Sequence, residues 1–212
     1  MAGANIGLFR QLPKHIFIIY FLDFIITFDG TFYSIFESQF KLMNLKSYIN
    51  IPDFPKKGIL FKDITPMLAN VNALKYAADE LSAMITIEEV KIDKVVGIES
   101  RGFIIGPMIA ERLGAGFVPV RKKGKLPYTV TSKSYGLEYG EDTLEIHIDA
   151  IKEGENVLIH DDVLATGRTA KAVCDLIKEC GGNVVLCNFI MELSFLNGKN
   201  NLSAPSESLL AY

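Results

Sequence analysis

The stretch VLIHDDVLATGRT, residues 157–169, decides the fold class of this chain and the kind of site that it carries. An apolar run ends in two adjacent acids, Asp161 and Asp162, and a short glycine-containing turn follows. Apolar residues then recur every three or four positions, so the pattern predicts a buried strand, a tight loop and the start of a helix. The backbone N–H groups at a helix start lie at the positive end of the helix dipole, and they bind phosphate readily.

The acids and the loop predict two different contacts with one ligand. Asp161 and Asp162 do not bind phosphate themselves because like charges repel, but they suit sugar hydroxyls or a metal ion. The candidate phosphate-binding residues are Ala165, Thr166, Gly167, Arg168 and Thr169. A phosphate loop beside paired acids indicates a site for a phosphorylated sugar.

Strand-like and helix-like segments alternate over the body of the chain. The predicted strands are 94–98, 117–120, 157–160 and 184–190, and the predicted helices are 74–90, 103–113 and 169–180. This alternation predicts an α/β fold with a mostly parallel central sheet flanked by helices. Ligands of such sheets bind beyond the carboxyl ends of the strands, which is where segments 99–102 and 161–169 lie.

The pattern breaks down between residues 121 and 144, a segment that is first basic and then rich in glycine and tyrosine. Long irregular connections in compact domains are usually functional lids or disordered segments, so we predict a lid here. We also expect residues 143–148 and 156–159 to flank 149–155 as a hairpin-like return.

Length, charge and cysteine content exclude several classes of protein. A chain of 212 residues suits one domain with appendages, and a formal net charge of −3 argues against a nucleic-acid-binding surface. Cys174, Cys180 and Cys187 form no CxxC pair, which fits core packing in a reducing cytoplasm rather than a metal site. His160, on an apolar strand, is expected to be a packed core residue.

The first 42 residues differ in character from the rest. Residues 16–28 are apolar and aromatic, but they are fewer than the roughly twenty residues of a membrane span, and no small-residue cleavage site follows them. We interpret residues 1–42 as non-functional or upstream-translated sequence, and we expect no membrane association. A membrane anchor stays open as the alternative.

The acid pair and the loop that follows closely resemble the 5-phosphoribosyl-1-pyrophosphate (PRPP) signature of type I phosphoribosyltransferases. The resemblance implies that Asp161 and Asp162 contact the ribose hydroxyls and that residues 165–169 hold the 5′-phosphate. Arg168 stands where many purine-specific members have a second glycine, although hypoxanthine-guanine enzymes place a lysine there. A basic side chain at a phosphate-binding helix start is physically sensible.

Four further segments are similar, in the same order, to the adenine phosphoribosyltransferase family. Residues 51–66 resemble its hood, 99–102 its pyrophosphate-binding turn, 121–127 with 137–140 its mobile catalytic loop, and 191–198 its C-terminal region. The resemblance implies a phosphoribosyltransferase domain over residues 43–212. Its hood would span about 43–70 and its mobile loop about 121–143.

The same resemblance implies roles for single residues. Phe61 would stack on adenine, while the backbone groups of Leu60 and Lys62 read its Watson–Crick edge. Glu138, beside Tyr139 in the mobile loop, would handle the proton of the purine imidazole nitrogen. The implied pyrophosphate-binding residues are Glu99, Ser100, Arg101, Arg121 and Lys125. Arg101, a permanently charged forked donor, joins Glu138, Asp161 and Asp162 as a catalytic residue.

The implied reaction converts adenine and PRPP to AMP and pyrophosphate in purine salvage. The family further implies a cytoplasmic homodimer without a nucleic-acid partner. It also implies Mg²⁺ held mainly by substrate oxygens, with no direct protein ligands. Two alternatives stay open. One is another purine phosphoribosyltransferase, acting on xanthine or on hypoxanthine and guanine. The other is a PRPP-sensing regulator with the same fold, although residues 1–42 are too short and too apolar for a winged-helix DNA-binding domain.

Overall fold

The computed structural model describes residues 43–52, 57, 60–85, 90–136 and 140–212, without the side chains of 50–52, 60 and 61. The chain divides into two units, Met1–Met43 and Asn44–Tyr212. Residues 1–42, which we interpret as a non-functional extension, lie outside the description. Among the described residues, no helix is long and apolar enough to cross a bilayer.

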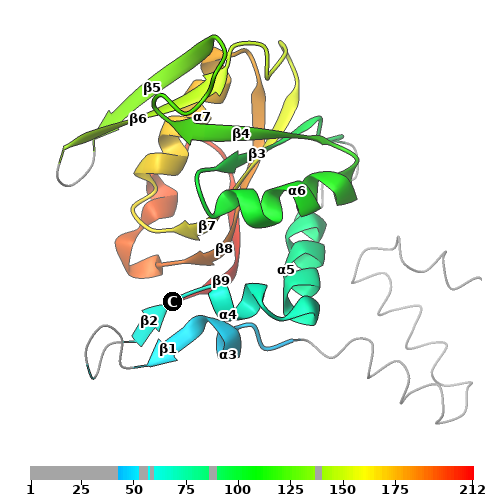
Figure 1. The fold of residues 1–212 in the computed structure, drawn as a ribbon, viewed down its shortest axis with the longest axis vertical. Coiled ribbons are helices and arrows are strands. Elements are labelled where there is room, and N and C mark those ends of the chain that lie inside the picture. Colours follow the sequence, from blue (N-terminus) through cyan, green and yellow to red (C-terminus); the bar gives the residue numbers. More distant parts are fainter. Residues whose placement is uncertain (1–42, 53–56, 58–59, 86–89, 137–139) are drawn as a thin grey trace, which may run out of the picture. The chain divides into compact units, whose positions relative to one another are not determined.

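A large sheet forms the centre of the second unit (Figure 1). Its described strands are β3 (Lys94–Ile98), β4 (Gly116–Lys122), β5 (Val130–Gly136), β6 (Glu141–His147), β7 (Asn156–Leu164), β8 (Asn183–Glu192) and β9 (Ser206–Ala211). They lie in the order β5-β6-β4-β3-β7-β8-β9. Neighbours from β4 through β3, β7 and β8 to β9 pair in parallel, whereas β6 pairs antiparallel with both β4 and β5. The predicted α/β fold with a mostly parallel sheet is confirmed.

Among the described residues, three longer helices flank the sheet. They are α5 (Val71–Ala83), α6 (Gly102–Leu113) and α7 (Arg168–Glu179). The connection from β3 through α6 to β4 and the connection from β7 through α7 to β8 run in opposite directions across the sheet. Because such crossovers are right-handed, α6 and α7 cover opposite faces, and α5 packs beside α6. The order in which successive strands are added therefore reverses between the parallel strands β3 and β7, and ligands of these folds bind at such a point.

Helix α7 holds its own start in place by burying an apolar face against the sheet. Val173, Leu176 and Ile177 are fully buried and belong to one core cluster with Phe189 of β8. Burying side chains of this size stabilises a fold by roughly 1.5–3 kcal/mol each.

The cysteines pack in the core as expected, since Cys174 and Cys187 are buried and Cys180 is partly buried. His160 is also fully buried, as predicted.

The described residues between 46 and 68 form a small separate layer, the hood. It contains α3 (Lys46–Ile49), β1 (Asn50–Pro52), β2 (Leu60–Lys62) and α4 (Thr65–Leu68). Strands β1 and β2 pair antiparallel, with Asn50 opposite Lys62. The Asp63 carboxylate accepts hydrogen bonds from the N–H and the hydroxyl of Thr65, at 3.0 and 2.7 Å, and so orders the start of α4.

Several sequence-based predictions of local structure need correction. Helix α5 begins three residues before the predicted start, because Asn70 caps it, and it ends at Ala83 rather than at 90. The hairpin-like return is wrong, because β6 pairs with β4 and β5 while β7 pairs with β3 and β8. The predictions also missed β5 and β9. Both are edge strands with few fully apolar positions, so they lack the apolar run of a central strand.

Candidate active site

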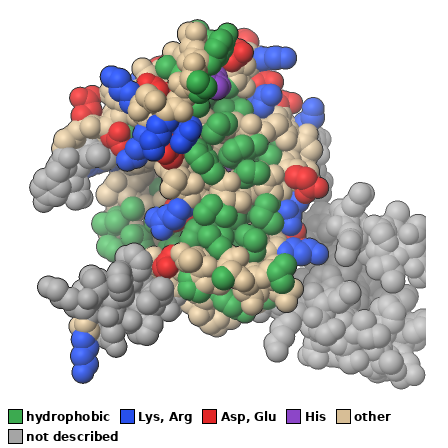
Figure 2. All heavy atoms as spheres, in the orientation of Figure 1, with side chains coloured by type: hydrophobic (Ala, Val, Ile, Leu, Met, Phe, Trp, Pro, Cys, Tyr) green, Lys and Arg blue, Asp and Glu red, His purple; other side chains and the backbone are tan. Residues whose placement is uncertain are grey.

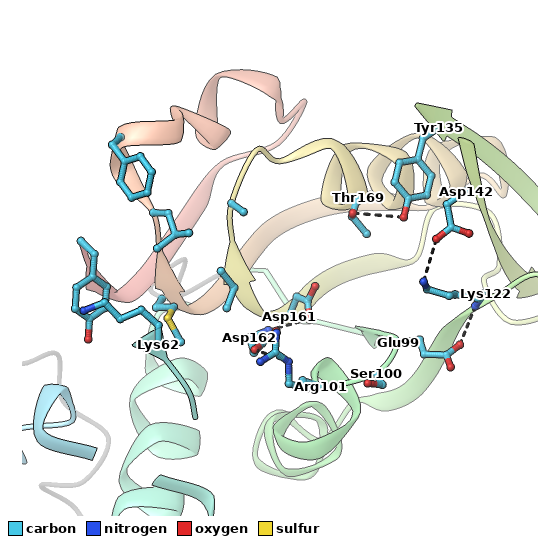
Figure 3. A pocket seen from close by; sticks show the side chains of 16 residues that line it. Lys62, Glu99, Ser100, Arg101, Lys122, Tyr135, Asp142, Asp161, Asp162 and Thr169 are labelled. Carbon is cyan, nitrogen blue, oxygen red and sulfur yellow. Dashed lines mark hydrogen bonds and ion pairs between the residues drawn. The ribbon is translucent and has the colours of Figure 1, made fainter. Parts of the chain in front are cut away.

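A cavity of about 730 Å³ lies at the carboxyl edge of the parallel strands (Figure 3). Its walls come from the turn after β3, the end of β7 with the following loop, the β4–β6 region, the C-terminal segment and the hood. The lining residues are Lys62, Glu99, Ser100, Arg101, Lys122, Tyr135, Asp142, Asp161, Asp162, Val163, Ala165, Thr169, Met191, Leu193, Phe195 and Tyr212. The two segments that the sequence placed at this edge, 99–102 and 161–169, therefore share one cavity.

Asp162 is buried, Asp161 beside it is partly buried, and the pair is linked to the turn after β3. Asp162 is 4% exposed, and its Oδ2 lies 3.0 Å from Nε of Arg101. The N–H of Asp162 donates to Oδ1 of Asp161 at 2.9 Å. Burial, together with the neighbouring negative charge of Asp162, raises the pKa of Asp161 well above its ordinary range. Burial also raises the pKa of Asp162, against the opposing charge of Arg101. Such a pair favours ligands that bring hydroxyl donors or positive charge.

Gly102 explains how the turn and the acid pair come so close. A Cβ at Gly102 would lie 2.7 Å from the carbonyl oxygen of His160 and 3.3 Å from Oδ1 of Asp161. Only a residue without a side chain lets the first turn of α6 lie against the end of β7. Glycine at this position therefore sets the approach of Arg101 to Asp162.

The loop of residues 165–169 is braced from behind by the C-terminal segment. Gly167, which precedes α7, has a φ of +77°, and a Cβ there would lie 2.3 Å from the carbonyl oxygen of Gly198. Nδ2 of Asn201, in the short helix η3 (Gly198–Asn201), donates to the carbonyl oxygen of Thr166 at 2.8 Å. No described side chain caps the start of α7, so its first N–H groups suit an oxyanion.

Thr169 and Arg168 take different positions at this helix start. Thr169 lines the cavity, and its hydroxyl donates to the Tyr135 hydroxyl of β5 at 3.5 Å. Arg168, the first residue of α7, has an exposed side chain and does not line the cavity.

The basic residues at the other end of the cavity are paired with carboxylates. Glu99 accepts a hydrogen bond from the N–H of Lys122 at 2.8 Å. It also pairs with Nζ of Lys125 and, at 3.5 Å, with Nε of Arg121. Nζ of Lys122 lies 3.1 Å from Asp142. Figure 2 shows basic side chains beside acidic ones at the end of the molecule where Figure 1 shows β4, β5 and β6.

Glu99 lines the cavity, whereas the side chains of its partners Arg121 and Lys125 do not. Burial by itself would raise the pKa of Glu99, but Lys125, the Lys122 N–H and Arg121 outweigh it and hold that pKa below its ordinary value. Arg121 and Lys125 are not lining residues. Of the residues predicted to bind pyrophosphate, the structure brings Glu99, Ser100 and Arg101 to the cavity.

Other predicted site residues lie outside the description. These are Glu138 and Tyr139, together with the side chains of Leu60 and Phe61. The backbone of β2 is described, and its last residue, Lys62, lines the cavity.

Sequence reasoning missed several lining residues. Lys122 stands in the basic run and Leu193 in the C-terminal motif, so both had a signal in the sequence. Tyr135 and Asp142 lie within the predicted mobile loop and Phe195 within the C-terminal motif, but nothing marked these residues singly, and Tyr212 had no signal at all. The tertiary fold brings them to the cavity.

The fold and the site define the class of protein, and comparison with known proteins agrees. Residues 66–193 match the phosphoribosyl transferase domain family. The chain is 59% identical to the adenine phosphoribosyltransferase of Flavobacterium johnsoniae over 173 residues, which cover 80% of this chain and 100% of that protein. It is 54% identical to the adenine phosphoribosyltransferase of Brachyspira hyodysenteriae over 172 residues, again 80% of this chain and 100% of that protein.

Solved structures give the same result. Adenine phosphoribosyltransferase from Rhodothermus marinus has a TM-score of 0.72 and 54% identity, over 79% of this chain and 96% of that one. The enzyme from Saccharomyces cerevisiae, in complex with an imino-altritol bisphosphate and adenine, has a TM-score of 0.72 and 45% identity, over 78% and 96% of the two chains. The chain belongs to the adenine phosphoribosyltransferase family.

Proposed function

We propose that this chain transfers the 5-phosphoribosyl group of PRPP to adenine, yielding AMP and pyrophosphate in purine salvage. One observation carries the proposal. The acid pair, the braced loop of residues 165–169 and the turn bearing Arg101 share one cavity beside β3 and β7, from which the crossover connections run in opposite directions across the sheet. A phosphorylated sugar with a pyrophosphate leaving group needs these three parts. The choice of adenine rests on the relatives, which are named for that base.

The chemistry is a displacement at ribose C1′. The bond from C1′ to the pyrophosphate oxygen breaks and a bond to adenine N9 forms, through a state with oxocarbenium character. Asp161 and Asp162 orient the ribose hydroxyls and stabilise the positive charge that develops on the ring. Residues 165–169 anchor the 5′-phosphate, and Arg101 binds the leaving group. Catalysis then depends on positioning and charge stabilisation rather than on a covalent enzyme intermediate.

Two further roles belong to residues whose side chains lie outside the description. Glu138, with Tyr139 beside it, takes the proton that the purine imidazole loses, in a site from which closure of the loop excludes water. Phe61 stacks on the adenine ring. Glu138→Ala should therefore lower kcat more than it weakens PRPP binding, and an unchanged kcat would remove Glu138 from the mechanism.

The donor set of the cavity suits Mg²⁺ that arrives with PRPP. Within the described residues, no three His, Cys, Asp or Glu side chains gather into a metal-binding group. The negative charge of the two adjacent carboxylates nevertheless suits a nearby cation whose ligands are substrate oxygens and water, with no direct protein ligand. Bound in this way, Mg²⁺ would neutralise part of the pyrophosphate charge, while Asp162 stays available to Arg101.

Base-dependent release of pyrophosphate tests the proposal. The purified chain receives PRPP and Mg²⁺ with adenine, hypoxanthine, guanine or xanthine in separate reactions. We expect turnover with adenine alone. Turnover with an oxopurine would retain the PRPP site and overturn the choice of base. Tight PRPP binding without turnover of any base would point to a sensor with the same fold.

The family also supports a proposal for the assembly and location of the chain. We infer a homodimer in the cytoplasm, with residues 1–42 dispensable for activity. Light scattering on the full chain measures the assembly. A second protein that begins at Met43 measures the contribution of the extension, because equal activity of the two would support the inference and lost activity would contradict it.

A further inference from the structure

The C-terminal residue and the hood meet beside the cavity. Nζ of Lys62, the last residue of β2, lies 3.5 Å from the centroid of the Tyr212 ring. Nζ of Lys46, in α3, lies 5.3 Å from the same centroid. Figure 1 marks the C-terminus beside β2, and Figure 3 places Lys62 at the opposite end of the cavity from Glu99 and Lys122. The contact therefore lies away from the pyrophosphate end.

The backbone of Tyr212 is held by the main sheet and not by the hood. The N–H of Tyr212 donates to the carbonyl oxygen of Glu192 at 3.1 Å, and its own carbonyl oxygen accepts from the N–H of Ser194 at 2.8 Å. Strand β9 pairs with β8 up to Ala211, the residue before Tyr212. The backbone that carries the ring is thus an extension of the central sheet.

Lys46 and Lys62 of the hood are the cations that the Tyr212 ring attracts. A cation within about 6 Å of an aromatic centroid is attracted by the negative face of the ring, and the attraction grows when the cation is shielded from water. Burial, and after it the charge of Lys46, lowers the pKa of Lys62. Placing two lysines on one ring offsets part of their mutual repulsion and ties both α3 and β2 to the sheet.

We propose that Tyr212 is a positioning residue for the purine base, which holds β2 against the cavity through Lys62. The inference rests on the proposed function, in which the backbone groups of Leu60 and Lys62 read the edge of adenine. Loss of the ring leaves β2 free to move relative to the acid pair and the phosphate loop. Adenine binding then weakens, while the groups that hold PRPP keep their geometry.

Steady-state kinetics on the full-length protein tests this role. The proteins compared are the wild type, Tyr212→Leu, Tyr212→Phe, Lys62→Met and the double variant Tyr212→Leu/Lys62→Met. Tyr212→Leu removes the ring face, and we expect it to raise the KM for adenine about three- to thirty-fold, with the KM for PRPP changed less than about two-fold. Tyr212→Phe keeps the ring face and is the matched control for its loss, so the KM for adenine should rise far less than in Tyr212→Leu.

The double variant separates positioning through Lys62 from direct contact of Tyr212 with the base. If the two residues act as one unit, Lys62→Met raises the KM for adenine as Tyr212→Leu does, and the double variant is no worse than either single one. Additive effects, or a Lys62→Met protein like the wild type, would overturn the inference in favour of direct contact.

The remaining outcomes are also decisive. Normal adenine turnover with an unchanged KM in Tyr212→Leu would overturn the inference and leave the proposed function intact. A wild-type protein that does not turn over adenine would instead overturn the proposed function. If Tyr212→Leu fails to fold, Lys62→Met carries the test, because it changes only the hood side of the contact and leaves the sheet backbone unaltered.

Discussion

Gly167 and Gly198 are in backbone contact across the phosphate loop. A Cβ built on Gly167 would lie 2.3 Å from the carbonyl oxygen of Gly198, and one built on Gly198 would lie 2.2 Å from the carbonyl oxygen of Ala165. Contacts this short with backbone atoms cannot be relieved by rotating a side chain. The C-terminal segment therefore acts as the support on which the loop rests.

Gly167→Ala should disable the phosphate loop. The substitution adds the clash with Gly198 to the strain of a positive φ, and we expect the KM for PRPP to rise by at least about ten-fold. Gly154→Ala is the matched control, because Gly154 has a φ of +78° but open space around it. Thermal unfolding and PRPP kinetics are measured for both. Equal losses in the two variants would show that backbone strain, not the contact with Gly198, matters.

Replacing the acid pair by amides should separate activity from stability. Asp161→Asn/Asp162→Asn removes the charges that orient the ribose, so turnover should be abolished. Because burial raises the folded-state pKa of Asp161, ionising this carboxyl costs stability once the pH exceeds its unfolded value of about 3.9. At neutral pH the single variant Asp161→Asn should therefore unfold at the wild-type temperature or above it. Near-normal activity of the double variant would contradict the ribose assignment.

His160 should make the fold sensitive to mild acid. Its ring pairs with Asn188 at 2.9 Å, and burial lowers its pKa from 6.5 to about 4. A depressed histidine pKa contributes stability that is complete above pH 6.5 and is lost as the pH falls towards 4, about 3 kcal/mol in all. Denaturant unfolding between pH 7 and 4 should show this slope in the wild type and in His147→Gln. The loss of stability should be smaller by about that amount in His160→Gln, and an undiminished slope there would assign the effect to other groups.

Glu99→Gln should tighten pyrophosphate binding. Glutamine can still accept the Lys122 N–H, but it no longer holds the charges of Arg121 and Lys125. These partly exposed cations become available to another anion, and we expect the Kd for pyrophosphate to fall about three- to ten-fold. Calorimetry with pyrophosphate measures this change, and AMP serves as the control ligand. Weaker pyrophosphate binding would mean that Glu99 instead holds the two cations in a productive position.

The central strands and the core of the site could be predicted because their signals are local. The strand before Asp161, the loop that follows and the apolar face of α7 lie within about two dozen consecutive residues, and each has a distinct period or composition. The turn at Glu99 follows another apolar strand in the same way. Parallel strands have their carboxyl ends at one edge, which is why these two segments could be placed in one cavity from the sequence.

The edge strands and the partners of charged groups could not be predicted in this way. Strand β5 mostly alternates partly buried with exposed positions and is an edge strand beside β6 in the described sheet, so it carries no apolar run. The ion pairs of Arg121 and Lys125 with Glu99 join residues 22 and 26 positions apart. The charge of a side chain does not predict which of the many carboxylates in the chain will be its partner after folding.

The sequence by itself determined the α/β class and the strand, loop and helix that carry Asp161 and Asp162, because each follows from the period and chemistry of neighbouring residues. Only the tertiary structure decided that Gly198 supports the loop, that Arg101 pairs with Asp162 and that the Tyr212 ring meets Lys62. The last contact joins residues 150 positions apart. Such a contact depends on the register of β9 beside β8 and on the packing of the hood, and both are settled by the burial of the whole chain rather than by any one segment.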